Sequence, residues 1–314
     1  MGLKPGGSPS EPLRPRLREI DVDRGTIVRE IAHEVDPAHA PSPRSHQEFT
    51  AATFLADGLL LQPAHTELLW IDPRRARIER VVSDPRFHGV HSAAADPGGG
   101  VVVTCAGTDT VLGLDRSGAV DRAWNLAPRT LPRGDLRRVD HDALKPHAIH
   151  PNFASYVDET LWVTCFEPHD ARAIDGPGPG RRIALPESFP HDGRLRAGWL
   201  WFTQVAGRVI AVDPVTLERR LTVDLRARCT DGTFGWCRGV EVVGSRLFVG
   251  VTMLRDTRHR EVLRELILGP PGRRLPTRVI EFDLDRMRIV REIPVGNGAG
   301  GTIYSVLAPP DRAG

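Results

Sequence analysis

The sequence predicts an all-β protein built from short, repeated strands. Glycine and proline are abundant, with 31 and 27 residues, whereas the 314-residue chain holds only 3 Met and 2 Tyr. This composition favours many turns and few long helices. With 40% hydrophobic residues the chain can bury a sizeable core, which excludes a disordered or collagen-like protein.

An internal repeat supports this fold class. Residues 20–31 (IDVDRGTIVREI) and 282–293 (FDLDRMRIVREI) share eight of twelve positions. In both segments an apolar strand ends in Asp, and a turn leads to a second strand. The same unit recurs along the chain, with its Asp at Asp21, Asp72, Asp115, Asp175, Asp213 and Asp283. An Asp in this place accepts backbone N–H bonds in the turn that follows, so these residues are predicted to shape turns rather than to catalyse.

The strands between these turns predict the architecture. Each repeat is expected to hold about four short strands, which is the pattern of a propeller blade. Six repeats therefore predict a six-bladed β-propeller. Residues 17–31 and 302–307 are expected to share one blade and so to close the ring without a free edge. Residues 17–310 would form a single domain, preceded by a flexible arm rich in Pro, Gly and Ser over residues 1–16.

Two insertions interrupt the repeats. Residues 129–145 are polar and basic, whereas residues 256–268 carry apolar side chains at helical spacing and are predicted to form a helix. An insertion on a repeat scaffold either covers a site as a lid or only decorates the surface, and both alternatives are open here.

The charge balance and the cysteine content indicate which binding partners and which cellular compartment to expect. The 42 Lys and Arg residues nearly balance the 40 Asp and Glu residues and are scattered, so nucleic acid is not an expected partner. No apolar run approaches the ~18 residues of a membrane span, and the first residues lack the apolar stretch of a secretory signal. We therefore expect a cytoplasmic protein that does not bind membranes. Its four cysteines are expected to be reduced thiols, although Cys229 and Cys237 could pair if the compartment allowed.

Histidines gather where a propeller places its functional residues. The first strand of each blade lines the axis, so equivalent residues at its start form a ring. Aligning the repeats on their second strands places four residues at this level: His91, His150, His191 and Arg238. Two of these histidines end a repeated His-x-x-His motif, formed by His88 with His91 and by His147 with His150.

This ring predicts a metal centre. Imidazoles without a carboxylate in the same register suit Fe, Cu, Mn, Zn or Ni better than Ca or Mg. We expect one transition-metal ion, and its predicted ligands are His91, His147, His150 and His191. His46 is an alternative fourth ligand, and His88 could support the ligands from behind. The competing interpretation is that histidines of surface loops gather here by chance or bond backbone carbonyls in the channel.

Arg238 adds a fixed positive charge at the same level. It could clamp a carboxylate, phosphate or sulfate of a substrate with paired N–H bonds. Alternatively it forms an ion pair with Glu241 or Asp192. These two carboxylates are also the candidate general bases, on position alone.

Two strand units carry a resemblance to known proteins. Leu69-Trp-Ile-Asp72-Pro, and Val209-Ile-Ala-Val-Asp213-Pro following Trp199-Leu-Trp-Phe-Thr203, resemble the six-bladed propeller superfamily of NHL-repeat, strictosidine-synthase-like, gluconolactonase-like and streptogramin-lyase-like proteins. The resemblance implies the propeller fold over residues 17–308. Gluconolactonase-like members hold a divalent ion through acidic and Asn ligands where this chain has His. Sugar-lactone hydrolysis is therefore not expected.

Together these observations predict a metal-dependent enzyme that acts at the axis on a small organic molecule, which would be anionic if Arg238 binds it. Oxidative chemistry is placed ahead of lyase, cyclase or isomerase chemistry. The contrasting prediction is a propeller without catalytic activity that binds a protein or ligand on its top face.

Overall fold

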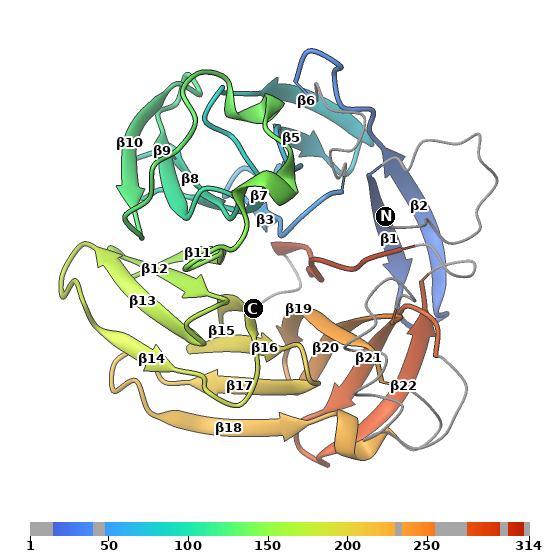
Figure 1. Cartoon of the computed structure of the whole chain (residues 1–314). Coiled ribbons are helices and arrows are strands. Elements are labelled where there is room, and N and C mark those ends of the chain that lie inside the picture. Colours follow the sequence, from blue (N-terminus) through green and yellow to red (C-terminus); the bar gives the residue numbers. More distant parts are fainter. Residues whose placement is uncertain (1–14, 40–47, 230–233, 255–274, 296–300, 311–314) are drawn as a thin grey trace.

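The computed structural model describes residues 15–39, 48–229, 234–254, 275–295 and 301–310. In these residues the strands form five four-stranded antiparallel sheets arranged as blades around an axis, together with one two-stranded sheet (Figure 1). The molecule is therefore all-β, as predicted. No helix among the described residues is both long enough and apolar enough to span a membrane.

The first three blades run from the inner to the outer strand in chain order. Their strands are β3 (Thr53–Phe54), β4 (Leu60–Pro63), β5 (Leu68–Asp72) and β6 (Arg77–Val82); β7 (Val90–Ala95), β8 (Val101–Cys105), β9 (Thr110–Leu114) and β10 (Val120–Asn125); and β11 (Pro151–Val157), β12 (Thr160–Cys165), β13 (Asp170–Asp175) and β14 (Arg182–Ala184). Two 3-10 turns, Leu136–Arg138 and His141–Leu144, lie in the predicted insertion 129–145 between the second and third blades.

The last two blades repeat this order, and a hairpin precedes the first blade. The blades contain β15 (Pro190–Arg196), β16 (Trp199–Gln204), β17 (Arg208–Val212) and β18 (Arg219–Asp224); and β19 (Trp236–Val243), β20 (Arg246–Thr252), β21 (Arg278–Asp283) and β22 (Arg288–Pro294). The hairpin pairs β1 (Arg16–Asp21) with β2 (Thr26–Ala32).

Burial follows the position of each strand in its blade. Middle strands such as β8 and β9 are buried along their whole length, which explains their continuous apolar sequences. The outer strand β6 instead alternates between exposed and partly buried residues, because one of its faces meets solvent. Inner strands of neighbouring blades also bond to one another: the amide of Ala154 on β11 donates to Ser92 Oγ on β7, 2.9 Å away.

The six aspartates perform the predicted role. Each carboxylate accepts one or more backbone N–H bonds from the turn that follows its strand, as Asp213 does from Val215 and Thr216 at 2.9 and 3.0 Å. The prediction of turn-forming aspartates is confirmed. The four cysteines are free thiols, and those on β8 and β12 are buried in the core.

The prediction of six blades closed by a shared sixth blade is wrong, because the described residues form five four-stranded blades. The likeness of residues 20–31 to 282–293 is that of two hairpins: β1–β2 and β21–β22 pair in the same way, each with an irregularity next to the first strand's Ile20 or Phe282. In the described part of the chain, no further strand joins β1 and β2. Residues 302–307, which were expected to complete this sheet, contain no strand.

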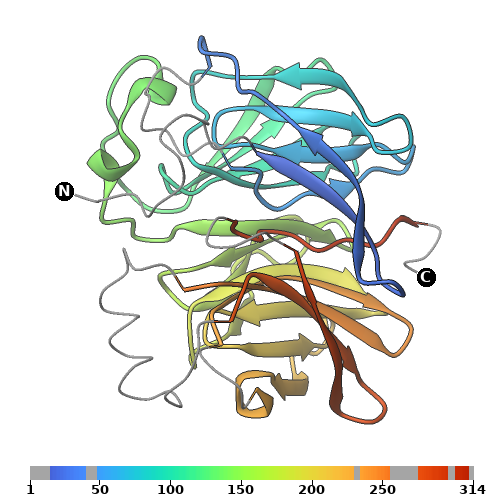
Figure 2. The same cartoon turned by 90° about the vertical axis from the view of Figure 1, so that its right-hand side faces the viewer.

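The segment 301–310 lies inside the ring instead (red in Figures 1 and 2). Its backbone is held by side chains and not by a strand ladder: the amide of Ile303 donates to Thr252 Oγ1 at 3.0 Å, and the amide of Ala308 donates to Glu241 Oε2 at 3.3 Å. Its apolar side chains pack between the hairpin β1–β2 and the blades next to it. Most of the predicted arm, residues 1–14, and the predicted helix 256–268 lie outside the described residues.

Candidate functional site

The inner strands bring the four aligned residues to the same end of the ring. His91 and His191 are the second residues of β7 and β15, Arg238 is the third residue of β19, and His150 directly precedes β11. Because these strands are neighbours around the axis, their first residues face a common region.

Ring contacts connect the histidines in a series. The His91 and His150 rings meet edge to face with centroids 4.9 Å apart, and His147 lies 5.1 Å from His150. Phe166 contacts His150 on one side and His191 on the other, each at 5.2 Å. Phe166 therefore connects His150 with His191. We call the following set the axial cluster: His91, His147, His150, Phe166, His191, Arg238 and Tyr304.

His91 is the best defined acid–base group of the cluster. Its Nδ1 lies 3.1 Å from the carbonyl oxygen of Gly89, and since a carbonyl only accepts, Nδ1 carries the proton. Nε2 then holds the lone pair. Burial, followed by the charges of His150, His65, Arg238 and His191, holds the pKa of His91 well below its usual range, so the ring is neutral at pH 7.

His150 is positioned from behind by a buried carboxylate. Asp109 Oδ1 accepts the amide N–H groups of His150 and Ile149 at 2.7 and 3.2 Å, and its Oδ2 accepts that of Ala148 at 3.0 Å. Asp109 is fully buried and also pairs with Arg129 at 3.1 Å. His150 has φ of 50°, a left-handed conformation that these three bonds stabilise.

The other His-x-x-His histidines connect the cluster to the insertion. His88 Nε2 donates to the carbonyl of Val139, 3.2 Å away, in the segment 129–145. Burial lowers the pKa of both His88 and His147, so these rings also favour the neutral form. His88 thus fixes the insertion to the second blade beside His147.

Arg238 lies between aromatic rings. Its guanidinium carbon lies 4.7 Å from the ring centroid of Trp236 and 4.9 Å from that of Tyr304, and the side chain is buried. Such stacking attracts a guanidinium through the ring quadrupole. Tyr304 also meets His91 edge to face at 6.0 Å, which joins Arg238 to the histidine series.

The two candidate general bases are engaged by the fold. Glu241 receives two bonds from Arg196, at 2.5 and 3.2 Å. Asp192 Oδ2 accepts the Thr203 hydroxyl at 2.6 Å and the Gly239 amide at 2.9 Å, and burial raises its pKa. These bonds stabilise the carboxylates as structural acceptors, and their use as bases stays a prediction.

The part of the chain that the structure describes contains no preformed metal-binding site. There, no three His, Cys, Asp or Glu side chains converge closely enough to hold a metal ion. Binding of a transition metal by His91, His147, His150 and His191 stays a prediction, and His46 lies outside the described residues.

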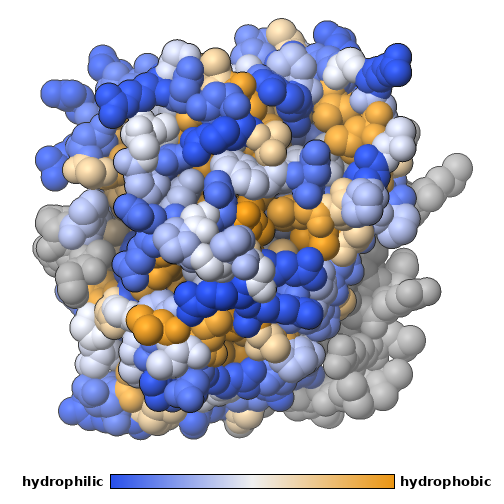
Figure 3. Space-filling view, turned by 90° about the vertical axis from the view of Figure 1, so that its left-hand side faces the viewer, coloured by the Kyte–Doolittle hydropathy of each residue, from blue (hydrophilic) through white to orange (hydrophobic). Residues whose placement is uncertain are grey.

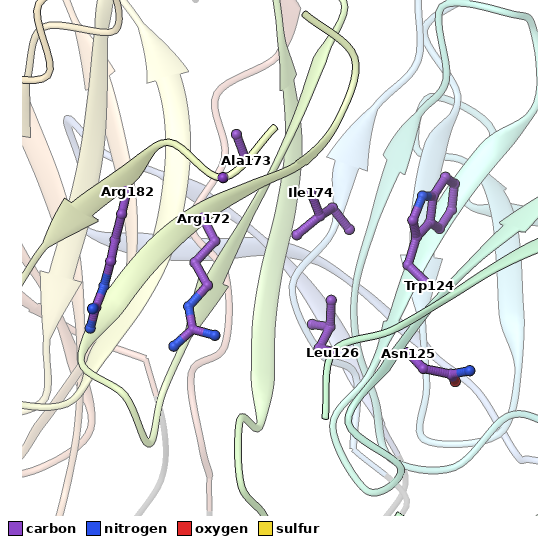
Figure 4. A pocket seen from close by; sticks show the side chains of 8 residues that line it. Trp124, Asn125, Leu126, Arg172, Ala173, Ile174 and Arg182 are labelled. Carbon is purple, nitrogen blue, oxygen red and sulfur yellow. The ribbon is translucent and has the colours of Figure 1, made fainter. Parts of the chain in front are cut away.

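A cleft of about 630 Å³ lies elsewhere, between β10 of the second blade and β13 and β14 of the third. Trp124, Leu126 and Ile174 line it together with Arg172 and Arg182 (Figure 4). Both arginines pair with the buried carboxylate of Asp170. Apolar residues are visible between polar ones on this side of the molecule (Figure 3). The cleft contains no residue of the axial cluster.

Comparison with solved structures supports the propeller fold. A protein of unknown function from Bacteroides caccae superposes with a TM-score of 0.61 and 14% identity over 93% of both chains. Virginiamycin B lyase from Staphylococcus aureus superposes with a TM-score of 0.53 and 12% identity, over 89% of this chain and 77% of the lyase. A catalytically inactive histidine-to-alanine variant of that lyase with quinupristin gives 0.51 and 13%, over 82% and 73%. No family model and no curated protein matches the sequence.

Several residues of the site were not found from the sequence. Phe166 enters from the turn after β12, Asp109 from the turn between β8 and β9, and Tyr304 from the segment 301–310. Tyr304 donates its hydroxyl proton to Glu48, with the oxygens 2.6 Å apart. An alignment confined to inner strands cannot detect residues that enter from turns and from non-repeating segments.

Proposed function

We propose that the protein is an enzyme that catalyses elimination from a small organic anion at the axial cluster. The observation that carries this proposal is the state of His91: a neutral, buried imidazole whose Nδ1–H is bonded to Gly89, so that Nε2 is available to accept a proton. Elimination needs a base, an acid and a group that binds the anion, and the cluster offers a residue for each role.

His91 Nε2 is the proposed base. It takes a proton from the carbon next to the carboxylate or carbonyl group of the substrate. The electrons of that C–H bond form a carbon–carbon double bond, and the bond to the leaving group breaks with its electron pair. His150, whose ring lies 4.9 Å from His91, is the proposed acid that protonates the leaving group. Atoms and electrons balance without an oxidant, which places elimination ahead of the oxidative chemistry expected from the sequence.

Arg238 is the proposed anion-binding residue. Its guanidinium would pair with the negative group of the substrate. Burial is the main cause of the low pKa of His91, and the negative charge of the substrate would offset the smaller contribution of the charged groups around it, Arg238 among them. A base kept neutral in the free enzyme thus becomes stronger when the correct substrate is bound.

The structural neighbours include an enzyme whose name gives the proposed reaction class. One is a lyase, and replacing a histidine gives its inactive form. At 12–13% identity the likeness concerns the fold, so the lyase proposal depends on the residues of this chain.

The test is a turnover assay on a panel of β-substituted carboxylic acids, followed through the ultraviolet absorbance of the new double bond. His91→Asn retains a donor for the Gly89 carbonyl but loses the base, so it should lower kcat by about 10²- to 10⁴-fold. His169→Asn is the matched control, because His169 contacts Phe189 and lies outside the axial cluster. Equal turnover by the two variants would contradict the proposal. Binding of the acids without any turnover would instead favour the non-enzymatic propeller.

A metal-dependent enzyme is the second candidate. The observation in its favour is that the pKa of His91 and that of His147 are lowered by burial, since the neutral imidazole is the form that binds transition metals. The bound ion would act as a Lewis acid on the substrate. Metal analysis of the purified protein distinguishes this candidate from the metal-free elimination.

A further inference from the structure

Tyr304 belongs to a segment that no repeat predicts and that the fold nevertheless fixes firmly. The segment 301–310 contacts the fifth blade through the bond from Ile303 to Thr252. It approaches β19 so closely that a Cβ on Gly239 would lie 2.8 Å from the backbone nitrogen of Val306. Gly239 has φ of 78° and lacks a side chain, which permits this contact next to Arg238.

The phenol of Tyr304 is held at its far end. Its hydroxyl donates to Glu48 at 2.6 Å, in the segment that leads into the first blade. Burial, followed by the nearby Glu48 carboxylate, raises the pKa of Tyr304, so the hydroxyl stays protonated and remains the donor. The ring is therefore anchored on both sides: by its own backbone against the fifth blade, and by Glu48 in the segment before the first blade.

The anchored ring restricts Arg238. Rings of Tyr304 and Trp236 both lie within 5 Å of the guanidinium carbon, at 4.9 and 4.7 Å. A guanidinium that stacks on aromatic faces keeps its N–H donors in its own plane, where they can form two parallel bonds with a planar carboxylate. The contact of Tyr304 with His91 sets the position of Arg238 relative to the proposed base.

We propose that Tyr304 is a positioning residue that orients Arg238 for bidentate binding of a carboxylate, so that segment 301–310 completes the substrate site. The inference rests on the proposed function and deepens it, because it identifies the anion as a carboxylate and segment 301–310 as the part of the fold that selects it. Tyr304 acts through Arg238 and takes no part in proton transfer.

Benzoate is the probe, and its Kd is measured by titration calorimetry on the full chain. Tyr304→Leu removes the stacked ring and should weaken benzoate binding by about tenfold. Tyr304→Phe keeps the ring but loses the hydrogen bonds of the hydroxyl to Glu48 and Arg238, and should weaken binding by about threefold. Tyr156→Phe is the matched control, because the only other tyrosine of the chain bonds to Asp96 on the second blade. This control should leave the Kd unchanged.

A double-mutant cycle separates positioning from a general effect on stability. In an Arg238→Lys background, Tyr304→Leu should cause no further loss of affinity, since Lys has no planar fork to orient. An equal loss in both backgrounds, or an unchanged Kd in Tyr304→Leu and Tyr304→Phe, would overturn the inference. If Tyr304→Leu does not fold, the benzoate Kd of Tyr304→Phe is compared with that of Tyr156→Phe, and equal values would overturn the inference. Absence of benzoate binding in the unmodified protein would refute the anion-binding part of the proposed function, and the inference with it.

Discussion

Acidification should destabilise this protein through its buried imidazoles, and His91 should account for a measurable share. Its pKa is lowered well below 6.5 in the folded state, whereas the ring of the unfolded chain titrates near 6.5. Below that pH the unfolded state binds more protons than the folded state. Stability therefore rises with pH across this range and falls as the pH is lowered.

The size of the effect follows from linkage. For a single histidine that stays neutral when folded, lowering the pH from about 7 to about 5.5 removes about 1.2 kcal/mol of stability. His88 and His147, whose pKa values are also lowered by burial, bring the upper limit for three rings to about 4 kcal/mol. The share of His147 is smaller than that of a fully buried ring, because this residue is partly exposed and solvent screens its charge. Most of the carboxylates with lowered pKa values lose their contributions only at lower pH. Asp192, with a raised pKa, opposes the trend.

The assay is urea denaturation followed by circular dichroism at the two pH values. His91→Asn keeps a donor toward the Gly89 carbonyl and cannot titrate in this range, so its loss of stability between the two pH values should be smaller by about 1.2 kcal/mol. The reasoning is refuted if the variant and the unmodified protein lose the same free energy of unfolding.

Three further predictions concern the cluster and its surroundings. If the metal-dependent candidate is correct, protein purified without a His tag should carry close to one transition-metal ion per chain. The double variant His91→Ala, His191→Ala should lose this ion. Full metal content in that variant would exclude the proposed ligands. Arg238→Lys should fold normally and bind carboxylates more weakly, whereas a much lower melting temperature with unchanged affinity would mark Arg238 as a structural residue. Arg196→Ala should cost about 3–5 kcal/mol in urea denaturation because it leaves the buried Glu241 carboxylate without its guanidinium, and a cost under about 1 kcal/mol would contradict this account.

The strand pattern was predictable because it depends on local chemistry. Apolar runs between turn-forming aspartates are sufficient to locate strands such as β8 and β17. The number of blades was not predictable in this way. The strongest repeat, residues 20–31 against 282–293, marks a hairpin and not a complete blade. A hairpin motif carries no information on whether distant residues will supply its missing partners. In residues 301–310 the backbone bonds to side chains instead.

In the site too, the local sequence pattern predicts some residues, whereas others depend on tertiary packing. The position of His91, His191 and Arg238 at the starts of inner strands follows from the periodicity, and the structure has them there. Phe166 comes from a turn and Tyr304 from outside the repeats, so their insertion between or beside these residues depends on tertiary packing. The sequence could therefore suggest which residues meet, but not the order of their contacts.

The placement of residues 301–310 also orders events during synthesis. All strands of the five blades precede this segment in the chain, so every blade strand is translated before Tyr304 is added. A nascent or prematurely cut chain could then possess the histidines without the ring that flanks Arg238. The axial cluster is consequently completed by a residue that is synthesised after every blade strand around it.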